Sequence, residues 1–256
     1  MAIDLKRSIS SLRINFFFMG VLLGGWSTRI PELKTALKMS DATLGKTLIG
    51  SSIAAFLSSR IIGKLIQNLG TKKVFYLGSY VFPIGYLLIA YAPNPFFVFL
   101  GIMAFVMGYM FLDNPLTIIT QEIEAEQDRK YLSGFHAFWS IGTLAAAFFG
   151  SFLIGRVKYS YHLTGIAAIV FVVLVINGKK LASKKPNQEK VSTSDLPWFS
   201  PMGKIVILIG IGMMLSNGAE FGATDWSALF LRDVLAITGQ LYVGAYIAFE
   251  SGMIIS

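Results

Sequence analysis

The sequence contains no cysteine, few charged residues and only 2 histidines. Without cysteine, the chain can form neither a disulfide framework, nor a thiolate nucleophile, nor a cysteine-ligated metal site. Charged residues make up 14% of the 256 residues, whereas a soluble domain has roughly 25%. That is too few to cover a soluble fold. Because hydrophobic residues reach 54% and the mean hydropathy is +0.64, the composition indicates that lipid covers much of the surface.

Long windows without charge predict where the chain crosses a bilayer, because a spanning helix needs about 20 predominantly apolar residues. The uncharged stretch that follows Lys73 is too long for one helix, and the segment Pro93–Pro95 divides it into two. We therefore predict five clear spanning helices, at Val74–Ala92, Phe96–Thr120, Ser133–Ile154, Tyr159–Ile176 and Ile205–Ala223.

Three further apolar stretches are less clear. Ile14–Thr28 is short, but the flanking Arg13 and Arg29 can snorkel and lengthen its reach. An alternative reading of this stretch is a signal peptide, but the number of spans that follow favours a first transmembrane helix. Thr43–Leu69 carries its charges near its two ends, as suits a helix beside a polar cavity. Gly239–Ser256 begins an eighth apolar stretch, within which the sequence ends.

Lysine and arginine are distributed unevenly between the two sets of loops. With the N-terminus inside, fifteen of the 22 lysines and arginines fall on the cytoplasmic side. This bias follows the positive-inside rule and predicts a cytoplasmic N-terminus. It also accounts for the net charge of +8 without nucleic acid as a partner. A long polar stretch predicts a cytoplasmic linker over residues 178–203, between a six-helix bundle over 1–177 and an incomplete second bundle over 204–256.

A loop motif lies between the predicted second and third helices. It begins at Gly63 and includes Gly70, Lys72 and Lys73. The motif resembles the loop signature of the major facilitator superfamily, Gly-x-Leu-x-Asp-x-x-Gly-x-Lys/Arg-Lys/Arg, with Gln67 at the acidic position. Gly63 would permit close helix contact, Gly70 would permit a tight turn, and the two lysines would lie at the cytoplasmic face. The alternative interpretation is an ordinary basic loop that follows a glycine at a helix end.

Other stretches extend the resemblance over nearly the whole chain. Arg29–Lys34 and Ser40–Gly45 resemble the first outer loop of a bacterial, mostly uncharacterised permease branch that is distantly similar to the fucose permeases. His136–Ser140 and Asp225–Asp233 are similar to its fifth and seventh helix segments. The resemblance implies an all-α protein integral to the bacterial inner membrane. In this twelve-helix family the chain would comprise a complete six-helix N-terminal half and the start of the C-terminal half, truncated within the eighth helix.

Polar residues inside the spans are candidates for function, because they are costly in a bilayer. Asp113 and Asn114 precede Pro115 in the fourth predicted helix, and Glu220 lies late in the seventh. Asp113 is either a substrate or proton site or a polar cap near the inner rim. Glu220 is either a proton-coupling residue or an uncoupled carboxylate. The resemblance implies that the first, fourth and seventh helices line the cavity, which adds Asn15 to these candidates.

Several other polar residues are assigned structural roles. His136 is predicted to form hydrogen bonds at a helix end, and it falls at the opposite membrane face from His162, so no metal site is predicted. Glu250 is predicted to be tolerated in its helix rather than functional. A solvated outer loop is predicted for three residues: Asp225, Arg232 and Asp233.

The leading hypothesis is transport of a small polar solute, with sugars among the candidates, by alternating access and with proton coupling as an option. A membrane enzyme is disfavoured, because the sequence has no cysteine, histidine cluster or paired histidine–carboxylate motif; no cofactor is predicted. The alternative is a truncated, non-transporting remnant or a membrane subunit that needs a partner, either a missing C-terminal half or a second copy. Because alternating access needs two bundles, this chain alone is not expected to catalyse net transport.

Overall fold

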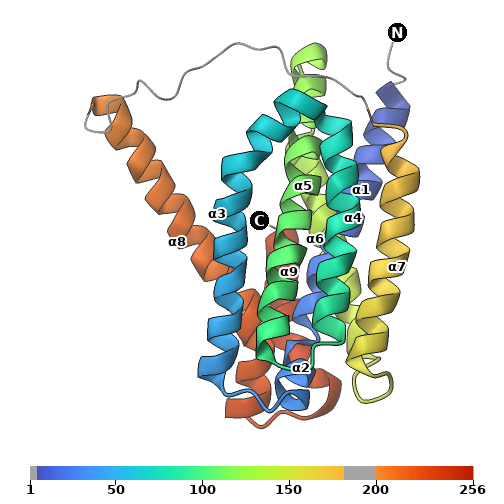
Figure 1. The fold of residues 1–256 in the computed structure, drawn as a ribbon, viewed down its shortest axis with the longest axis vertical. Coiled ribbons are helices and arrows are strands. Elements are labelled where there is room, and N and C mark those ends of the chain that lie inside the picture. The colour runs from blue at the N-terminus through green and yellow to red at the C-terminus, as the bar shows by residue number, and fades with distance from the viewer. Residues whose placement is uncertain (1–4, 182–199, 256) are drawn as a thin grey trace.

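Every regular element of the computed structural model, which describes residues 5–181 and 200–255, is a helix (Figure 1). In chain order the elements are α1 (Leu5–Ser27), α2 (Ile30–Ala36), α3 (Asp41–Leu69), α4 (Thr71–Ala90), α5 (Pro95–Gln127), α6 (Leu132–Ser151), α7 (Tyr159–Gly178), α8 (Pro201–Leu229), η2 (Phe230–Val234), η3 (Gly239–Val243) and α9 (Gly244–Ile255).

Within the described residues, seven helices are long and apolar enough to cross a membrane. They correspond to seven of the eight apolar stretches found in the sequence, and the eighth, Gly239–Ser256, contains η3 and α9. The short helix α2 lies in the first predicted outer loop. The predicted all-α membrane fold is therefore confirmed. Most of the predicted linker, residues 182–199, lies outside the described part of the chain.

Two helices extend well beyond the spans predicted from hydropathy. α5 runs to Gln127, past the predicted end at Thr120, and α1 begins at Leu5 rather than at Ile14. Backbone hydrogen bonding continues a helix into water wherever the side chains allow it, whereas hydropathy marks only the part that lies in lipid. The end of α5 is also tied to α6, because the Glu124 carboxylate accepts bonds from the first backbone N–H groups that follow the loop.

Local sequence signals place the helix ends. The predicted cap Ser40 accepts a hydrogen bond from the Thr43 backbone N–H at 3.1 Å. Asn94, in the segment expected to break the long apolar stretch, caps α5 by accepting from the backbone N–H of Phe96 at 3.1 Å. Gly70 ends α3 with φ of +85°, a conformation that glycine adopts without strain. The turn predicted at Gly70 is therefore present.

Small residues allow α1 and α6 to pack closely. Gly142, Ala146 and Gly150 are spaced four apart, which predicts one shared helix face. A Cβ atom at Gly142 would collide with the Phe17 backbone of α1, and the Ala146 side chain packs at Gly24 of α1. The contact between α1 and α6 is therefore a backbone-to-backbone packing that larger side chains would prevent.

We expect Gly142→Ala to destabilise the bundle, because the added methyl group overlaps the Phe17 carbonyl. Overpacking of this kind costs about 1–3 kcal/mol. The matched control is Gly165→Ala in α7, where no atom lies within 4 Å of the new Cβ position. In that open position alanine stabilises a helix relative to glycine by about 0.5–1 kcal/mol. Thermal unfolding in detergent should rank Gly165→Ala at or above the parent and Gly142→Ala below it; equal melting temperatures for the two variants would contradict the packing.

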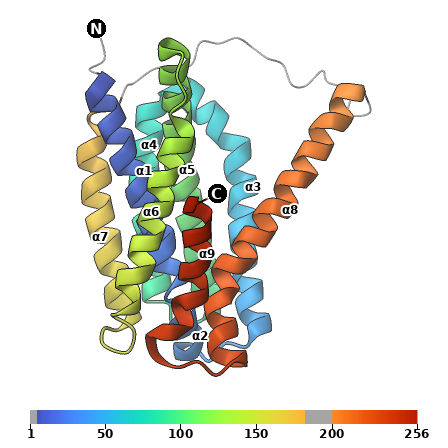
Figure 2. The same ribbon diagram turned by 180° about the vertical axis from the view of Figure 1, so that it is seen from behind.

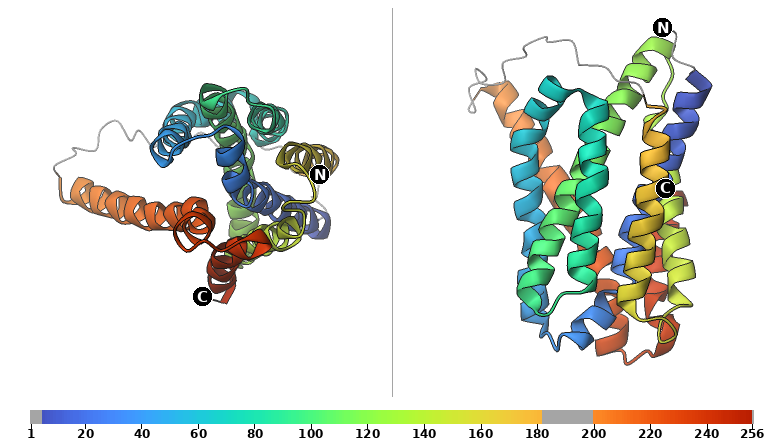
Figure 3. Two further views of the ribbon diagram at one scale, coloured as in Figure 1. Left: turned by 90° about the horizontal axis from the view of Figure 1, so that it is seen from below. Right: turned by 45° about the vertical axis from the view of Figure 1, so that its right-hand side comes forward.

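Helix α8 joins the other helices only towards its C-terminal end. Figures 1 and 3 show it leaving the bundle at an angle towards its N-terminal end. Its side chains are correspondingly exposed, with Leu208, Met214 and Leu215 at 65–67%. Near its C-terminal end it contacts α2, η3 and α9, and α9 packs in turn on α6 (Figure 2). The C-terminal segment is thus attached to the first six spans at the end of the molecule that holds α2.

Candidate functional site

Three spanning helices bring ionisable side chains together inside the bundle. The indole Nε1 of Trp139 on α6 donates a hydrogen bond to the Tyr109 hydroxyl on α5 at 2.6 Å. Asp113 on α5 and Glu220 on α8 each interact electrostatically with His136 on α6, and both carboxylates interact with Tyr109. We call Tyr109, Asp113, His136, Trp139 and Glu220 the central cluster.

The central cluster unites two of the predicted site residues, Asp113 and Glu220, from helices far apart in the sequence. Its imidazole, His136, was predicted to be a structural residue at a helix end. It lies near the start of α6, is exposed, and is within electrostatic range of both carboxylates. Within the described residues, no group of three histidine or carboxylate side chains could hold a metal ion. The chemistry that these side chains can perform is hydrogen bonding, charge neutralisation and proton exchange.

The other two predicted site residues lie differently. The Asn114 side chain is half-buried and donates to the Met110 carbonyl of its own helix at 3.0 Å. Asn15 is completely buried, and its Nδ2 donates to the Ser11 hydroxyl at 3.3 Å. Ser11 in turn donates to the backbone carbonyl of Asn177 at the end of α7 at 2.9 Å. Asn15 therefore belongs to the contact between α1 and α7 rather than to the central cluster.

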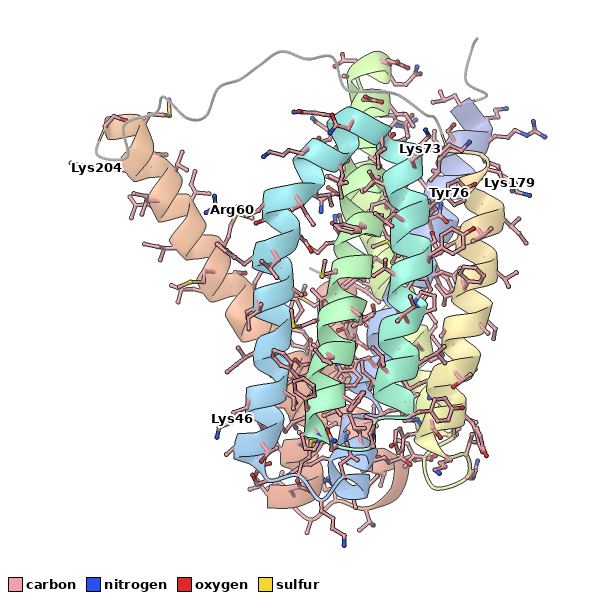
Figure 4. The ribbon with its side chains drawn as sticks, viewed as in Figure 1. Lys46, Arg60, Lys73, Tyr76, Lys179 and Lys204 are labelled. Carbon is pink, nitrogen blue, oxygen red and sulfur yellow. The ribbon has the colours of Figure 1, made fainter. Side chains whose placement is uncertain are left out.

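The residues of the predicted loop motif occupy one end of the bundle. Lys72 donates through Nζ to the backbone carbonyl of Lys179 at 2.8 Å, and so joins the start of α4 to the end of α7. Figure 4 shows Lys73 and Lys179 at this same end, whereas Lys46 lies at the opposite end. Gly63 faces open space, since no described atom lies within 4 Å of the position that a Cβ atom would take there. The close helix contact predicted for Gly63 is therefore absent among the described residues.

Two carboxylates lie in places that the sequence did not predict. Asp225, expected in a solvated loop, lies within α8 and is half-buried, because this helix runs on to Leu229. Glu250, expected to be merely tolerated, is only 2% exposed and lies within electrostatic range of Glu220. The spacing of Tyr246 and Glu250, one helical turn apart in an apolar stretch, is the signal that would have drawn attention to them.

Charged side chains also connect α2 with η2 at one end of the molecule. Lys34 lies 2.6 Å from the Asp233 carboxylate and 2.5 Å from Asp41. Arg232 donates to the Pro31 carbonyl at 2.5 Å and to the Thr35 hydroxyl at 3.0 Å. Arg232 and Asp233 were predicted to lie in a solvated loop. They lie at the surface in η2, whose turn brings them over α2, and both bind α2; we call these contacts the α2–η2 contact.

A basic cavity of about 360 Å³ lies near the start of α1, apart from the residues of the central cluster. It is bounded by α1 and by the segment between α5 and α6, and it is lined by Lys6, Ile9, Ser10, Arg13, Arg129 and Tyr131.

Comparison with known proteins identifies the family of this arrangement. The sequence profile of the Major Facilitator Superfamily matches residues 13–256, which is nearly the whole chain. The chain belongs to the Major Facilitator Superfamily. This agrees with the resemblance of its loop motif, and it makes the protein a member of a transporter family rather than of an enzyme family.

Three bacterial proteins are similar to this chain over most of its length. An uncharacterised transporter, y4wD, of Sinorhizobium fredii is 23% identical over 93% of this chain and 63% of its own length. An uncharacterised MFS-type transporter of Yersinia pestis is 24% identical over 95% of the chain and 62% of its length. The membrane protein MosC of Rhizobium meliloti is 25% identical over 97% and 60%. The chain thus spans less than two thirds of the length of these relatives.

The fold is also similar to that of a solved transporter. The crystal structure of the nucleoside transporter NupG superposes with a TM-score of 0.72 at 20% sequence identity, over 96% of this chain and 64% of NupG. At this identity the likeness extends to the fold alone. It supports a bundle of the superfamily type, formed by the described helices.

Proposed function

We propose that this chain is part of a carrier that moves a small polar solute across the bacterial inner membrane by alternating access. The observation that carries the proposal is the central cluster. Asp113 comes from the first six spans and Glu220 from the segment beyond the linker, and both interact with one imidazole, that of His136. A solute bound between them would contact both parts of the chain and could therefore respond to their relative movement.

Proton coupling is part of the proposal. An ionised carboxylate inside a bilayer costs ~2.5–3.5 kcal/mol on insertion scales, so Asp113 and Glu220 must be neutralised by a proton or by a bound group. His136 lies within electrostatic range of both carboxylates. Exchange of a proton for a solute at this position would couple the movement of the solute to the movement of protons across the membrane.

The arrangement of the helices supports a particular state of the carrier. The α2–η2 contact closes one end of the molecule, whereas α8 stands away from α3 at the other, where Arg60 and Lys204 are well separated in Figure 4. We assign the open end, which also carries Lys73 and Lys179, to the cytoplasm because of its lysines and arginines. The structure is then an inward-open state with its outer side closed.

A pair of single-cysteine variants tests this orientation, since the chain contains no cysteine of its own. Cysteine in place of Ser183, which lies outside the described residues, should react with an impermeant maleimide only after permeabilisation. Cysteine in place of the exposed Lys158, between α6 and α7, should react in intact cells. The reverse pattern of labelling would invert the proposed topology.

The proposed function is tested by thermal-shift screening of the purified chain against a library of sugars, polyols, amines and nucleosides. Binding of at least one solute is expected, and its loss in Glu220→Gln would locate the site at the central cluster. Binding that is equally strong in Glu220→Gln would place the solute elsewhere.

A second candidate function is a membrane subunit that acts only with a partner. Helix α8 favours it, because none of the apolar window within Met202–Val234 is buried, whereas 28–56% of the corresponding window is buried in each of the other described spans. Spanning helices pack against neighbouring helices, and a partner would supply the neighbours that α8 lacks. The partner would be a C-terminal half or a second copy of the chain. Light scattering of the purified chain in detergent separates a monomer from a dimer.

A further inference from the structure

The basic cavity near the start of α1 is lined by positive charge that no acidic side chain balances. Three of its six lining side chains, those of Lys6, Arg13 and Arg129, are cations, and none of the six is a carboxylate. Within the described ranges, none of these three cations forms an ion pair. The volume of about 360 Å³ is many times the ~30 Å³ share of one water molecule in the liquid, so an anionic group of the size of a phosphate fits.

Aromatic rings position the two guanidinium groups of the cavity. The guanidinium carbon of Arg13 lies 5.6 Å from the centroid of the Phe138 ring on α6. That of Arg129 lies 5.6 Å from the centroid of the Tyr131 ring. A guanidinium held over a ring face keeps its N–H groups, which lie in its own plane, available for hydrogen bonds. In the described part of the chain, these ring contacts are the interactions that the two guanidinium groups form.

The acidic side chains near the cavity do not neutralise it. Glu124 is engaged at the start of α6, where its Oε1 accepts hydrogen bonds from the backbone N–H groups of Tyr131 at 2.5 Å and Leu132 at 2.8 Å. Asp128, which precedes Arg129 in the chain, is exposed and does not line the cavity. The charge of the cavity therefore has to be met by an anion from outside these residues. Arginine presents its N–H donors in a fork that matches the oxygens of a phosphate group.

The basic cavity also borders an apolar helix face at one end of the bundle. Figures 1 and 4 place the start of α1 at the same end as Lys73 and Lys179. On α6, Phe138, Ile141 and Phe148 share one face by their spacing and are 37–47% exposed. Arg13 lines the cavity and contacts Phe138, so this face begins at the cavity.

The length of this apolar face corresponds to one leaflet of a membrane. From Phe138 to Phe148 the helix rises ~15 Å at ~1.5 Å per residue, which is about half of the ~30 Å of hydrocarbon in a bilayer. A ligand that fits both features has an anionic head in the cavity and an apolar chain along α6. A phospholipid has this form.

We propose that the basic cavity binds the phosphate group of an anionic phospholipid, with an acyl chain lying along the exposed face of α6. The phosphate oxygens would accept hydrogen bonds from Arg13 and Arg129, while Lys6 adds positive charge and the Ser10 hydroxyl can donate to a further oxygen. Basic pockets between transmembrane helices on the cytoplasmic side bind anionic headgroups in this way. A choline headgroup would instead add a positive charge to the three already present. The bound lipid would join α1 to the segment between α5 and α6.

Lipid binding at the basic cavity is tested on the whole 256-residue chain, purified in a neutral detergent. The chain is titrated with dioctanoyl-phosphatidylglycerol, which is anionic, and with dioctanoyl-phosphatidylcholine, which has the same acyl chains but is zwitterionic. Dissociation constants are measured by microscale thermophoresis. We expect the anionic lipid to bind at least about tenfold more tightly, through charge-assisted hydrogen bonds. The preference should shrink at about 1 M salt, where the Debye length is only about 3 Å.

Variants then locate the lipid. Arg13→Gln should weaken the binding of phosphatidylglycerol about fivefold, and the double variant Arg13→Gln with Arg129→Gln about 25-fold, because each basic side chain near a membrane surface adds about that factor. The matched control is Arg60→Gln on α3. Arg60 is also exposed and also lies over a ring, that of Phe56 at 5.1 Å, but it does not line the cavity. Its replacement should leave the affinity nearly unchanged. Should Arg13→Gln fail to fold, as judged by thermal unfolding, Lys6→Gln provides the same test.

Glycerol phosphate, which carries a phosphate group but no acyl chain, separates a lipid from a free phosphate compound. It should displace little phosphatidylglycerol at equal concentration, and full displacement would overturn the lipid assignment. Equal affinity for the two lipids would overturn the proposal. An effect of Arg60→Gln as large as that of Arg13→Gln would indicate diffuse attraction and overturn the assignment to the cavity. Each of these results leaves solute binding at the central cluster untouched, so the carrier function stands or falls separately.

Discussion

In a full-length version of the carrier, which contains a complete second bundle, replacement of Asp113 by asparagine is expected to abolish solute uptake while the protein still inserts into the membrane. The substitution keeps the size and shape of the side chain but removes its charge and its capacity to exchange a proton. Asp113 faces His136 from α5, so its loss leaves the imidazole with Glu220 as its only carboxylate partner in the central cluster. The first six spans then no longer contribute the Asp113 carboxylate at the proposed solute position, and only the Glu220 carboxylate from α8 remains.

Uptake is measured in cells that produce the full-length version, with a solute identified by the binding screen and with membrane content determined by immunoblotting. Asp128→Asn serves as the matched control, because it removes an exposed carboxylate at the end of the same helix. The expected result is uptake at background in Asp113→Asn and near the parental rate in Asp128→Asn. Full uptake in Asp113→Asn would show that Asp113 is only a polar cap near the inner rim and not a substrate or proton site.

In the same full-length version, cross-linking of the α2–η2 contact is expected to stop transport completely. Lys34 and Asp233 approach within 2.6 Å in the structure, so cysteines at both positions should be joined by a short bis-methanethiosulfonate reagent. A carrier whose outer side cannot open is held in the inward-open state, and alternating access requires both states. A reducing agent should restore uptake.

The control for this experiment is the pair Arg60→Cys and Lys204→Cys at the open end of the molecule. These positions lie apart on α3 and α8 in Figure 4, so the same short reagent should join them poorly in the inward-open state. Two results together would contradict the assignment of open and closed ends. One is efficient linkage of Arg60→Cys with Lys204→Cys. The other is undiminished uptake after complete linkage at Lys34 and Asp233.

Individual residues show where inference from the sequence was reliable. The cap at Ser40, the break before α5 and the turn at Gly70 are present where they were predicted, because each depends on residues adjacent in the chain. Asp225 was misplaced because no local signal indicates that α8 continues to Leu229. The contact of Arg232 with the Pro31 carbonyl was not predicted, because the two residues are 201 positions apart in the chain. Asn15 faces α7 because the rotation of α1 about its axis depends on packing with two other helices.

The sequence by itself determined that this protein is an all-α membrane protein, where its seven long helices lie and to which superfamily it belongs. Length and apolar composition decide these features, and both are properties of short stretches of chain. The tertiary structure alone decided that Asp113 and Glu220 lie within electrostatic range of His136, and that Glu250 is buried. These side chains come from four different helices, and only the crossing and rotation of those helices, set by close packing such as that at Gly142, bring them to one place.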